Sequence, residues 1–180
     1  MRELIATGRI AALAALLAVA GLCHAAVAEE NKIEAFTVWQ GKGQTYATGL
    51  KQGTLVGTAT GPMYIMTEKG PILSGDTVCP LVVTFDESDG SQTGRLRCII
   101  TTKDGTVFGE LTCTGFQFVG CSGDFKITGG TGRFNGVTGG GKVLIHSESR
   151  STGANRAADG SLTEEARGIM YWKELEYTIP

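Results

Sequence analysis

Short apolar or alternating runs, separated by Gly, Asp, Ser and Thr, recur along the 180-residue chain. Runs of this kind, bounded by turn-forming residues, are typical of β-strands. After the N-terminal leader, no long segment keeps apolar residues at helical spacing without a glycine interrupting it. The pattern predicts strand segments at about 33–39, 53–60, 62–68, 77–85, 94–102, 106–114, 122–128, 142–149 and 164–177.

The spacing of these segments predicts an all-β fold, either a sandwich or a barrel. A closed barrel also removes the unpaired strand edges that recruit other chains. Pro80 falls inside one segment, where it cannot donate a ladder hydrogen bond, so a bulge or an edge is expected there. The polar stretch ESRSTGANRAADGSLTEE, residues 148–165, predicts a mobile hairpin loop.

The N-terminus has the layout of a secretory signal peptide. Two arginines frame a short polar start, an apolar run follows over residues 10–23, and small residues lead to Ala28. The apolar run is shorter than the roughly 20 residues that a transmembrane helix needs, so no membrane span is expected. We expect cleavage after Ala28, with Ala25 as the alternative, and a single domain over residues 29–180. The mature protein would then be exported, to the periplasm or the extracellular space.

Four cysteines follow the leader, and an even count in an exported chain indicates disulfides, for which three pairings exist. The runs VCPLVVTF and RLRCIITT flank the polar turn DESDGSQTG. A hairpin centred near Ser88 would therefore set Cys79 opposite Cys98, leaving Cys113 and Cys121 to close a small loop. No pair of Cys or His ligands has the spacing of two to four residues usual in zinc sites. No bound metal is expected.

Charge excludes one class of partner. The chain has 16 Lys and Arg against 18 Asp and Glu, without a basic cluster. Nucleic-acid binding depends on clustered basic side chains that displace counterions from phosphates, so no nucleic-acid partner is expected.

The stretch ITGGTGRFNGVTGGGKV, residues 127–143, is unusually rich in glycine. Its segment from Gly136 to Lys142 matches G-x-x-x-x-G-K, but Val143 replaces the Ser or Thr that would hold magnesium, and a strand follows in place of a helix. We therefore interpret the glycines as a barrel corner, with two tight turns joined by a short extended piece whose Phe134 plugs the core. The residues predicted to build this corner are Gly129, Gly130, Gly132, Phe134 and Gly136.

The run FKITGGTGRFNGVTGGGKVLI resembles the signature of the allene oxide cyclase barrel-like family, which is related to dirigent-type barrels. The resemblance extends over about Thr77–Ile145. It implies an antiparallel eight-stranded barrel with a lipocalin-like cavity, often assembled as an oligomer, and no cofactor. It also implies catalysis aided by a carboxylate on the first strand and an ordered water, with Cys79 matching a cysteine near the family's pocket. Here the first strand has no carboxylate next to Val38 and Trp39, and a disulfide would remove the thiol of Cys79.

Other catalytic groups are sparse. His146 is the one histidine after the leader, and Glu148 shares its strand face. Such a pair could act as a general base, but beside a polar loop we interpret it as a solvated surface. No serine lies in a G-x-S-x-G stretch.

Aromatic and Met side chains are the candidates for lining a cavity, because residues two apart share one face of a strand. The alternative is that they fill a small barrel completely. On the last strand, Ile169 and Tyr171 make the second face apolar as well, which favours a subunit contact in a homo-oligomer. The cavity candidates are Trp39, Tyr64, Met66, Phe108, Phe125, Met170 and Trp172.

The sequence thus favours an exported barrel that binds a small apolar ligand or serves as a non-catalytic envelope component. The alternative is a cofactor-free cyclase or isomerase acting on a lipid-like substrate. A carboxylate or hydroxyl in a cavity that excludes water would favour the alternative, because a buried ionisable group is costly without a partner or a task.

Overall fold

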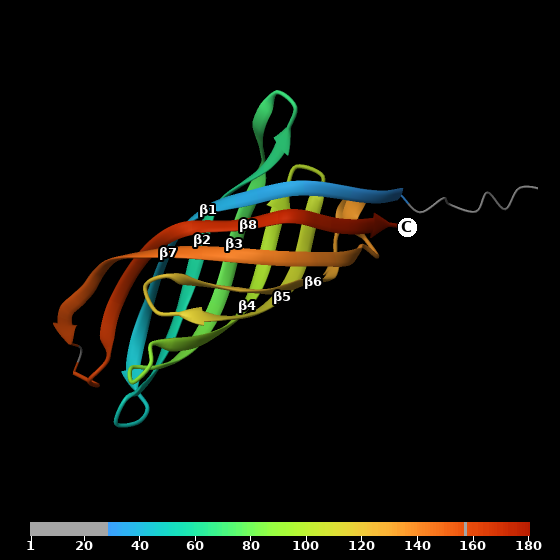
Figure 1. The fold of residues 1–180 in the computed structure, drawn as a ribbon. Coiled ribbons are helices and arrows are strands. Elements are labelled where there is room, and N and C mark those ends of the chain that lie inside the picture. The colour runs from blue at the N-terminus through green and yellow to red at the C-terminus, as the bar shows by residue number, and fades with distance from the viewer. Residues whose placement is uncertain (1–28, 157) are drawn as a thin grey trace, which may run out of the picture.

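A computed structural model describes the backbone of residues 29–156 and 158–180, and the side chains of residues 30–148 and 158–180. The predicted signal peptide lies outside the described residues. The described chain forms a closed barrel of eight antiparallel strands, each paired with the next in sequence, and the last paired with the first (Figure 1). The predicted all-β, eight-stranded antiparallel barrel is confirmed. No helix in the described ranges has the length and apolar character needed to cross a membrane.

The strands are longer than the sequence pattern predicts. They are β1 (Glu29–Ala47), β2 (Gln52–Thr67), β3 (Gly70–Asp86), β4 (Ser91–Thr102), β5 (Gly105–Phe116), β6 (Gly120–Gly130), β7 (Thr138–Arg156) and β8 (Leu162–Ile179), with a single 3-10 turn, η1 (Gly132–Phe134), between β6 and β7. The separate segments 53–60 and 62–68 are wrong, because Gly61 and Pro62 stay in the ladder opposite Thr77 and Asp76. The stretch predicted as a hairpin loop is mostly paired strand, since β7 and β8 extend almost to the tip of their hairpin.

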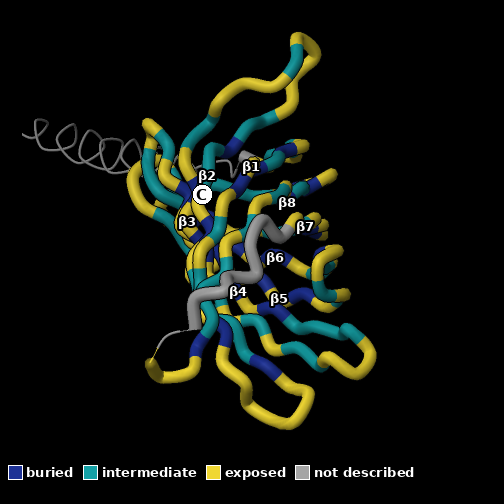
Figure 2. The backbone as a smooth tube through the Cα atoms, turned by 90° about the vertical axis from the view of Figure 1, so that its left-hand side faces the viewer, coloured by how far each residue is buried: buried dark blue, intermediate teal, exposed yellow. Residues whose placement is uncertain are grey.

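Alternate connections lie at opposite ends of the barrel. We call the end with the β1–β2, β3–β4, β5–β6 and β7–β8 connections the mouth end, and the other end the closed end. The β2–β3 hairpin projects from the closed end, and the turn after β1 projects from the mouth end (Figure 1). Figure 2 shows that buried positions follow the barrel wall while the hairpin tips are exposed.

Large inward side chains fill the closed half of the barrel. Trp172 is fully buried, and its indole meets the ring of Phe125 edge-on with centroids 5.4 Å apart. Met63, Ile100 and Leu175 are buried around this pair. Because side chains alternate between the two faces of a strand, every second residue of these segments contributes to this core.

Both predicted disulfides, Cys79–Cys98 and Cys113–Cys121, are present. The first joins directly opposed positions of β3 and β4, with Cα atoms 4.2 Å apart. The strand register is the same before and after Pro80, because Val78 pairs with Ile99 and Leu81 pairs with Leu96. The bulge or edge predicted at Pro80 is therefore wrong. Pro80 withholds one ladder hydrogen bond, and the adjacent disulfide links the two strands covalently instead.

The glycine-rich corner differs from its prediction in two respects. Its middle, expected to be extended, is the turn η1, in which the backbone N–H of Phe134 donates to the carbonyl oxygen of Thr131 at 3.1 Å. Gly132 and Gly136 have φ of 62° and 77°, values that glycine adopts without strain. The Phe134 ring is half-buried and packs against the core, so it covers the closed end rather than plugging it completely.

Gly132→Val is expected to lower the free energy of unfolding by at least about 2 kcal/mol, because a β-branched residue is strained at positive φ. A Cβ at this position would also lie 2.5 Å from the carbonyl oxygen of Asp104. Thermal unfolding measures the loss. Lys142→Ala is the control, since this exposed side chain makes only a surface ion pair with Asp124 at 2.6 Å and should shift stability by less than about 0.5 kcal/mol. A Gly132→Val variant as stable as the parent would contradict the structure of the corner.

Candidate ligand cavity

The mouth half of the barrel holds a cavity of about 180 Å³ to which all eight strands contribute. Several inward positions here carry small residues, whereas large side chains such as Trp172 and Phe125 fill the closed half. On β1 the inward series continues from Trp39 to Gly41 and Gly43, and on β8 Ala166 faces the same space. Gly43 also permits close strand approach, because a Cβ there would lie 2.7 Å from the carbonyl oxygen of Val56.

The cavity wall is mainly apolar. Trp39 and Met170 are both buried and separate the cavity from the filled half of the barrel. The wall also includes the apolar side chains of Leu55, Ala59, Leu81, Val83, Phe85, Leu96, Phe118, Ile145 and Ala166. Such a space favours a ligand that can remove apolar surface from water.

Two of the seven cavity candidates named from the sequence, Trp39 and Met170, line this cavity. Phe125 and Trp172 are buried but belong to the filled half. Tyr64, Met66 and Phe108 point to the outside of the barrel. Tyr64 stacks there on Phe36 with centroids 5.1 Å apart, and Met66 and Phe108 are exposed. Period-2 alternation groups residues on one face, but it does not say which face is the inner one.

Sequence reasoning missed a carboxylate on the wall, Glu164. It lies on the inward face of β8, in step with Ala166 and Met170, which also line the cavity. Its Oε1 accepts a hydrogen bond of 2.7 Å from the hydroxyl of Thr45, a buried residue of β1. Extending the face of Gly168, Met170 and Trp172 backwards by two residues at a time would have identified Glu164.

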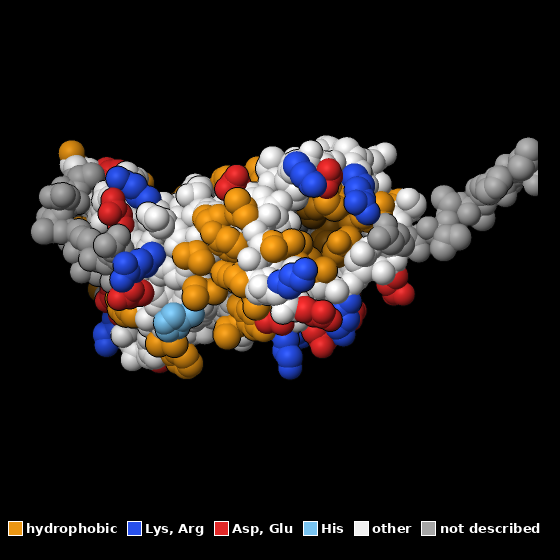
Figure 3. Space-filling model, turned by 90° about the horizontal axis from the view of Figure 1, so that it is seen from above, with side chains coloured by type: hydrophobic (Ala, Val, Ile, Leu, Met, Phe, Trp, Pro, Cys, Tyr) orange, Lys and Arg blue, Asp and Glu red, His pale blue; other side chains and the backbone are white. Residues whose placement is uncertain are grey.

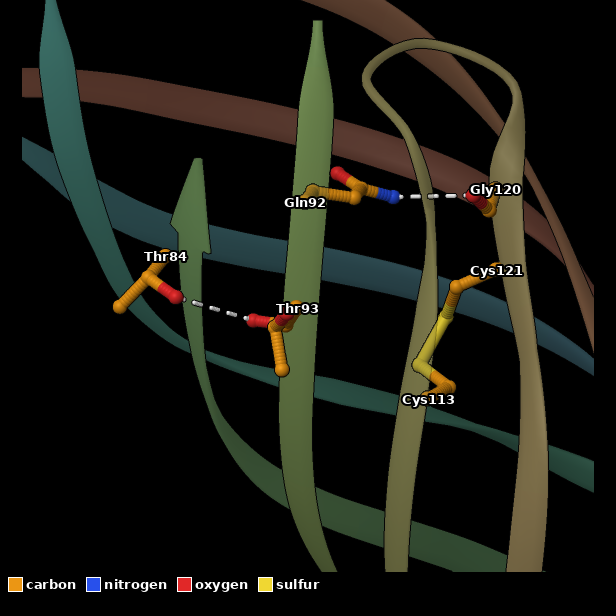
Figure 4. The surroundings of a disulfide bond; sticks show 6 residues. All are labelled: Thr84, Gln92, Thr93, Cys113, Gly120 and Cys121. Atoms are coloured by element: carbon orange, nitrogen blue, oxygen red, sulfur yellow. Dashed lines mark hydrogen bonds between the residues drawn. A yellow bond between two sulfur atoms is a disulfide. The ribbon is translucent and has the colours of Figure 1, made fainter. Parts of the chain in front are cut away.

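The β5–β6 loop forms part of the cavity rim through Phe118. This residue has φ of 61°, the one positive φ outside glycine in the described residues, and its side chain is 64% exposed. Four contacts fix the loop around it: the Cys113–Cys121 disulfide and three hydrogen bonds. The side-chain Nε2 of Gln92 donates to the carbonyl oxygen of Gly120 at 3.1 Å (Figure 4). The other two are backbone bonds, from Gln117 N–H to Gly90 at 2.9 Å and from Ser147 N–H to Val119 at 3.1 Å.

A left-handed conformation costs a bulky residue about 1 kcal/mol or more, and it persists where surrounding contacts enforce it. These contacts therefore hold the backbone of the loop that carries Phe118, an exposed aromatic residue on the rim of the apolar cavity. Among the residues that the structure describes, no other loop combines these features.

The catalytic candidates weighed from the sequence lie on the outer surface. His146 is exposed, and Glu148 pairs with Arg167, whose Nη2 lies 2.8 Å from Oε2 of Glu148. Glu34 accepts a hydrogen bond of 2.8 Å from the hydroxyl of Tyr171, which raises the pKa of that phenol. Within the described ranges, no group of His, Cys, Asp and Glu could hold a metal ion.

An apolar row crosses the outer face in direct register. It runs from Leu73 on β3 to Tyr64, Phe36, Tyr171 and Leu144, one residue from each of five neighbouring strands. Val38 and Ile169, opposed across β1 and β8, extend it towards the mouth end. We call these seven residues the outer patch. Figure 3 shows hydrophobic side chains gathered on this face beside the histidine.

No protein-family model matches the sequence, and no curated protein matches it. Among solved structures, the chain is similar to one described as the structure of a pterocarpan synthase dirigent protein. The two share 12% sequence identity over 80% of this chain and 86% of that chain, with a TM-score of 0.39. A likeness at this level does not establish family membership or shared activity.

Proposed function

We propose that this protein is an exported β-barrel that binds a small apolar ligand in the cavity of its mouth half. The single observation that carries the proposal is the cavity itself, with its apolar wall and its small inward residues at Gly41, Gly43 and Ala166. A barrel of eight strands has room for either packed side chains or one small ligand. In this chain, packed side chains fill the closed half, and the mouth half has room for one small ligand.

Export is supported by two features. The leader has the order of a signal peptide. Disulfides form and persist in oxidising compartments, and the described chain holds two. The proposed domain division is therefore a leader over residues 1–28 and one barrel over residues 29–180.

The features of the cavity favour binding over catalysis. Catalysis by a cofactor-free cyclase or isomerase, the alternative function, needs an ionisable group in a space that excludes water. Glu164 lines the cavity but is only half-buried, so its side chain is accessible to water. Glu34, the carboxylate of β1 nearest to Val38 and Trp39, is exposed on the outer surface.

We also propose that the outer patch is the subunit contact of a homo-oligomer. Its exposed members include Leu73, Leu144 and Ile169, which are 66%, 55% and 45% exposed. Contiguous exposed apolar side chains of this kind are characteristic of interaction surfaces.

Native mass spectrometry of protein purified from its own host tests the proposed function. We expect a mass increment from a retained small molecule that dissociates on denaturation, and spectra of an assembly of identical subunits. Protein that carries no increment and binds none of a set of small apolar compounds would contradict the ligand-binding proposal.

Ala166→Leu is expected to abolish ligand retention without loss of stability, because the added carbons occupy the cavity. Filling a cavity commonly adds about 0.5–2 kcal/mol to the free energy of unfolding. The measurements are native mass spectrometry and thermal unfolding. Ile169→Leu, on the outer face of the same strand, is the control and should retain the ligand. Ligand retention by Ala166→Leu at the parent level would place the binding site elsewhere.

A further inference from the structure

Glu164 gives the cavity an electrostatic character that its apolar wall alone would not have. Two ionisable side chains contribute to the lining in the described chain, Glu164 and Lys42. Lys42 is exposed, and its ammonium lies 3.4 Å from Oε1 of Glu165, so its charge is matched on the outer surface. Glu164 has no cationic partner among the side chains that the structure describes. Among the described side chains, the cavity wall therefore carries one carboxylate that has no cationic partner.

On its β1 side, Glu164 leaves room for a ligand group. Its cross-strand neighbour on β1 is Gly43, which offers no side chain to cover the carboxylate. Thr45 donates its hydroxyl to Oε1. A carboxylate can accept further hydrogen bonds at both oxygens, so acceptor capacity remains after this contact.

We infer that the cavity selects a small molecule with an apolar body and a protonated amine, the amine being held by Glu164 at the entrance. This inference rests on the proposed function, because it assigns a ligand class to the same cavity. The apolar body enters between Met170 and the wall around Leu55 and Phe85. An ammonium donor makes a charge-assisted hydrogen bond with the carboxylate, stronger than one from a neutral donor.

The size of the cavity limits the body of the ligand. A cavity of roughly 150 Å³ lined by apolar side chains accommodates benzene, and this cavity measures about 180 Å³. One aromatic ring with a short linker therefore fits. Phe118 lies on the rim, where its ring can cover the linker of a bound molecule.

Three probes of nearly equal size separate charge from apolar burial: 2-phenylethylamine, 2-phenylethanol and phenylacetate. At pH 7 the amine is cationic and the acid anionic, as expected from the pKa values of such groups. Calorimetric titration of the parent should give an affinity for the amine about tenfold higher than for the alcohol, and a weaker affinity for phenylacetate than for either.

Glu164→Gln keeps the shape of the side chain and removes its charge. It should weaken binding of the amine by about tenfold, to the level of the alcohol, while binding of the alcohol changes by less than about twofold. Glu165→Gln is the matched control, because Glu165 is the adjacent carboxylate but points outward to Lys42. It should leave all three affinities unchanged.

The outcomes separate this inference from the function on which it rests. If the alcohol binds and the amine is not preferred, the amine specificity is wrong and the ligand-binding function stands. If Glu164→Gln weakens the alcohol and the amine equally, Glu164 acts only on the structure of the wall and the inference is overturned. If none of the three probes binds the parent, both the inference and the proposed function are contradicted for ligands of this size.

Discussion

Trp172→Ala is expected to lower the free energy of unfolding by about 3–5 kcal/mol, the usual cost of removing a large aromatic side chain from a core. Trp172 is fully buried, and its loss also removes the edge-on contact with Phe125. For a domain of this size, each kcal/mol corresponds to roughly 2–4 °C in Tm, so thermal unfolding should show a decrease of about 6–20 °C.

Trp172→Phe is the matched control. The indole Nε1 of Trp172 is buried without a hydrogen-bond partner among the described residues, and such a group costs about 1–3 kcal/mol. Phenylalanine buries less apolar area than tryptophan, but it also removes the unpaired donor, so the two effects partly cancel. The free energy of unfolding should therefore fall by less than about 2 kcal/mol. An alanine variant no less stable than the phenylalanine variant would show that this half of the barrel is not closely packed.

Replacing Cys79 and Cys98 together by alanine should cost about 3 kcal/mol, from the chain entropy that a link over 19 residues removes from the unfolded state. Denaturant unfolding measures the loss. Peptide mapping without reduction should first find Cys79 linked to Cys98 and Cys113 linked to Cys121 in the parent protein. A crossed pairing, or four free thiols in protein from an oxidising compartment, would contradict the strand register described above.

The corresponding double replacement of Cys113 and Cys121 is the comparison. Its link spans 8 residues, and its loss should cost slightly less, about 2.5 kcal/mol. It should also weaken ligand binding, because it releases the loop that holds Phe118 at the rim. The Cys79 and Cys98 replacement should leave binding unchanged once the lower stability is taken into account.

Much of the fold could be predicted because it depends on local patterns. Alternation predicts strands wherever one face is buried. The turn DESDGSQTG sets the register of β3 and β4, and that register brings Cys79 opposite Cys98. The glycines at 132 and 136 indicate turns because few other residues adopt positive φ at low cost.

The cavity could not be predicted in the same way, because it depends on which face of each strand closes inward. Tyr64 and Met66 alternate as regularly as Trp39 and Gly41, yet the first pair points outward and the second lines the cavity. The sequence pattern also placed a strand end where the structure has none. Gly61 and Pro62 resemble a break in sequence, but they remain in a ladder held by both neighbouring strands. Tertiary pairing overrides local preference at such positions.

Closure of the barrel by β1 and β8 has a consequence for how the protein folds. Every other strand pairing joins neighbours in sequence, whereas this one joins opposite ends of the described chain, from Glu29 with Ile179 to Thr45 with Leu162. Contacts between distant segments form slowly, because the loop entropy must be lost before the contact stabilises anything. We expect the hairpins of neighbouring strands to form first and the closing pair last. Since β8 follows the other seven strands in the sequence, the closing pairing cannot form until all eight strands have been synthesised.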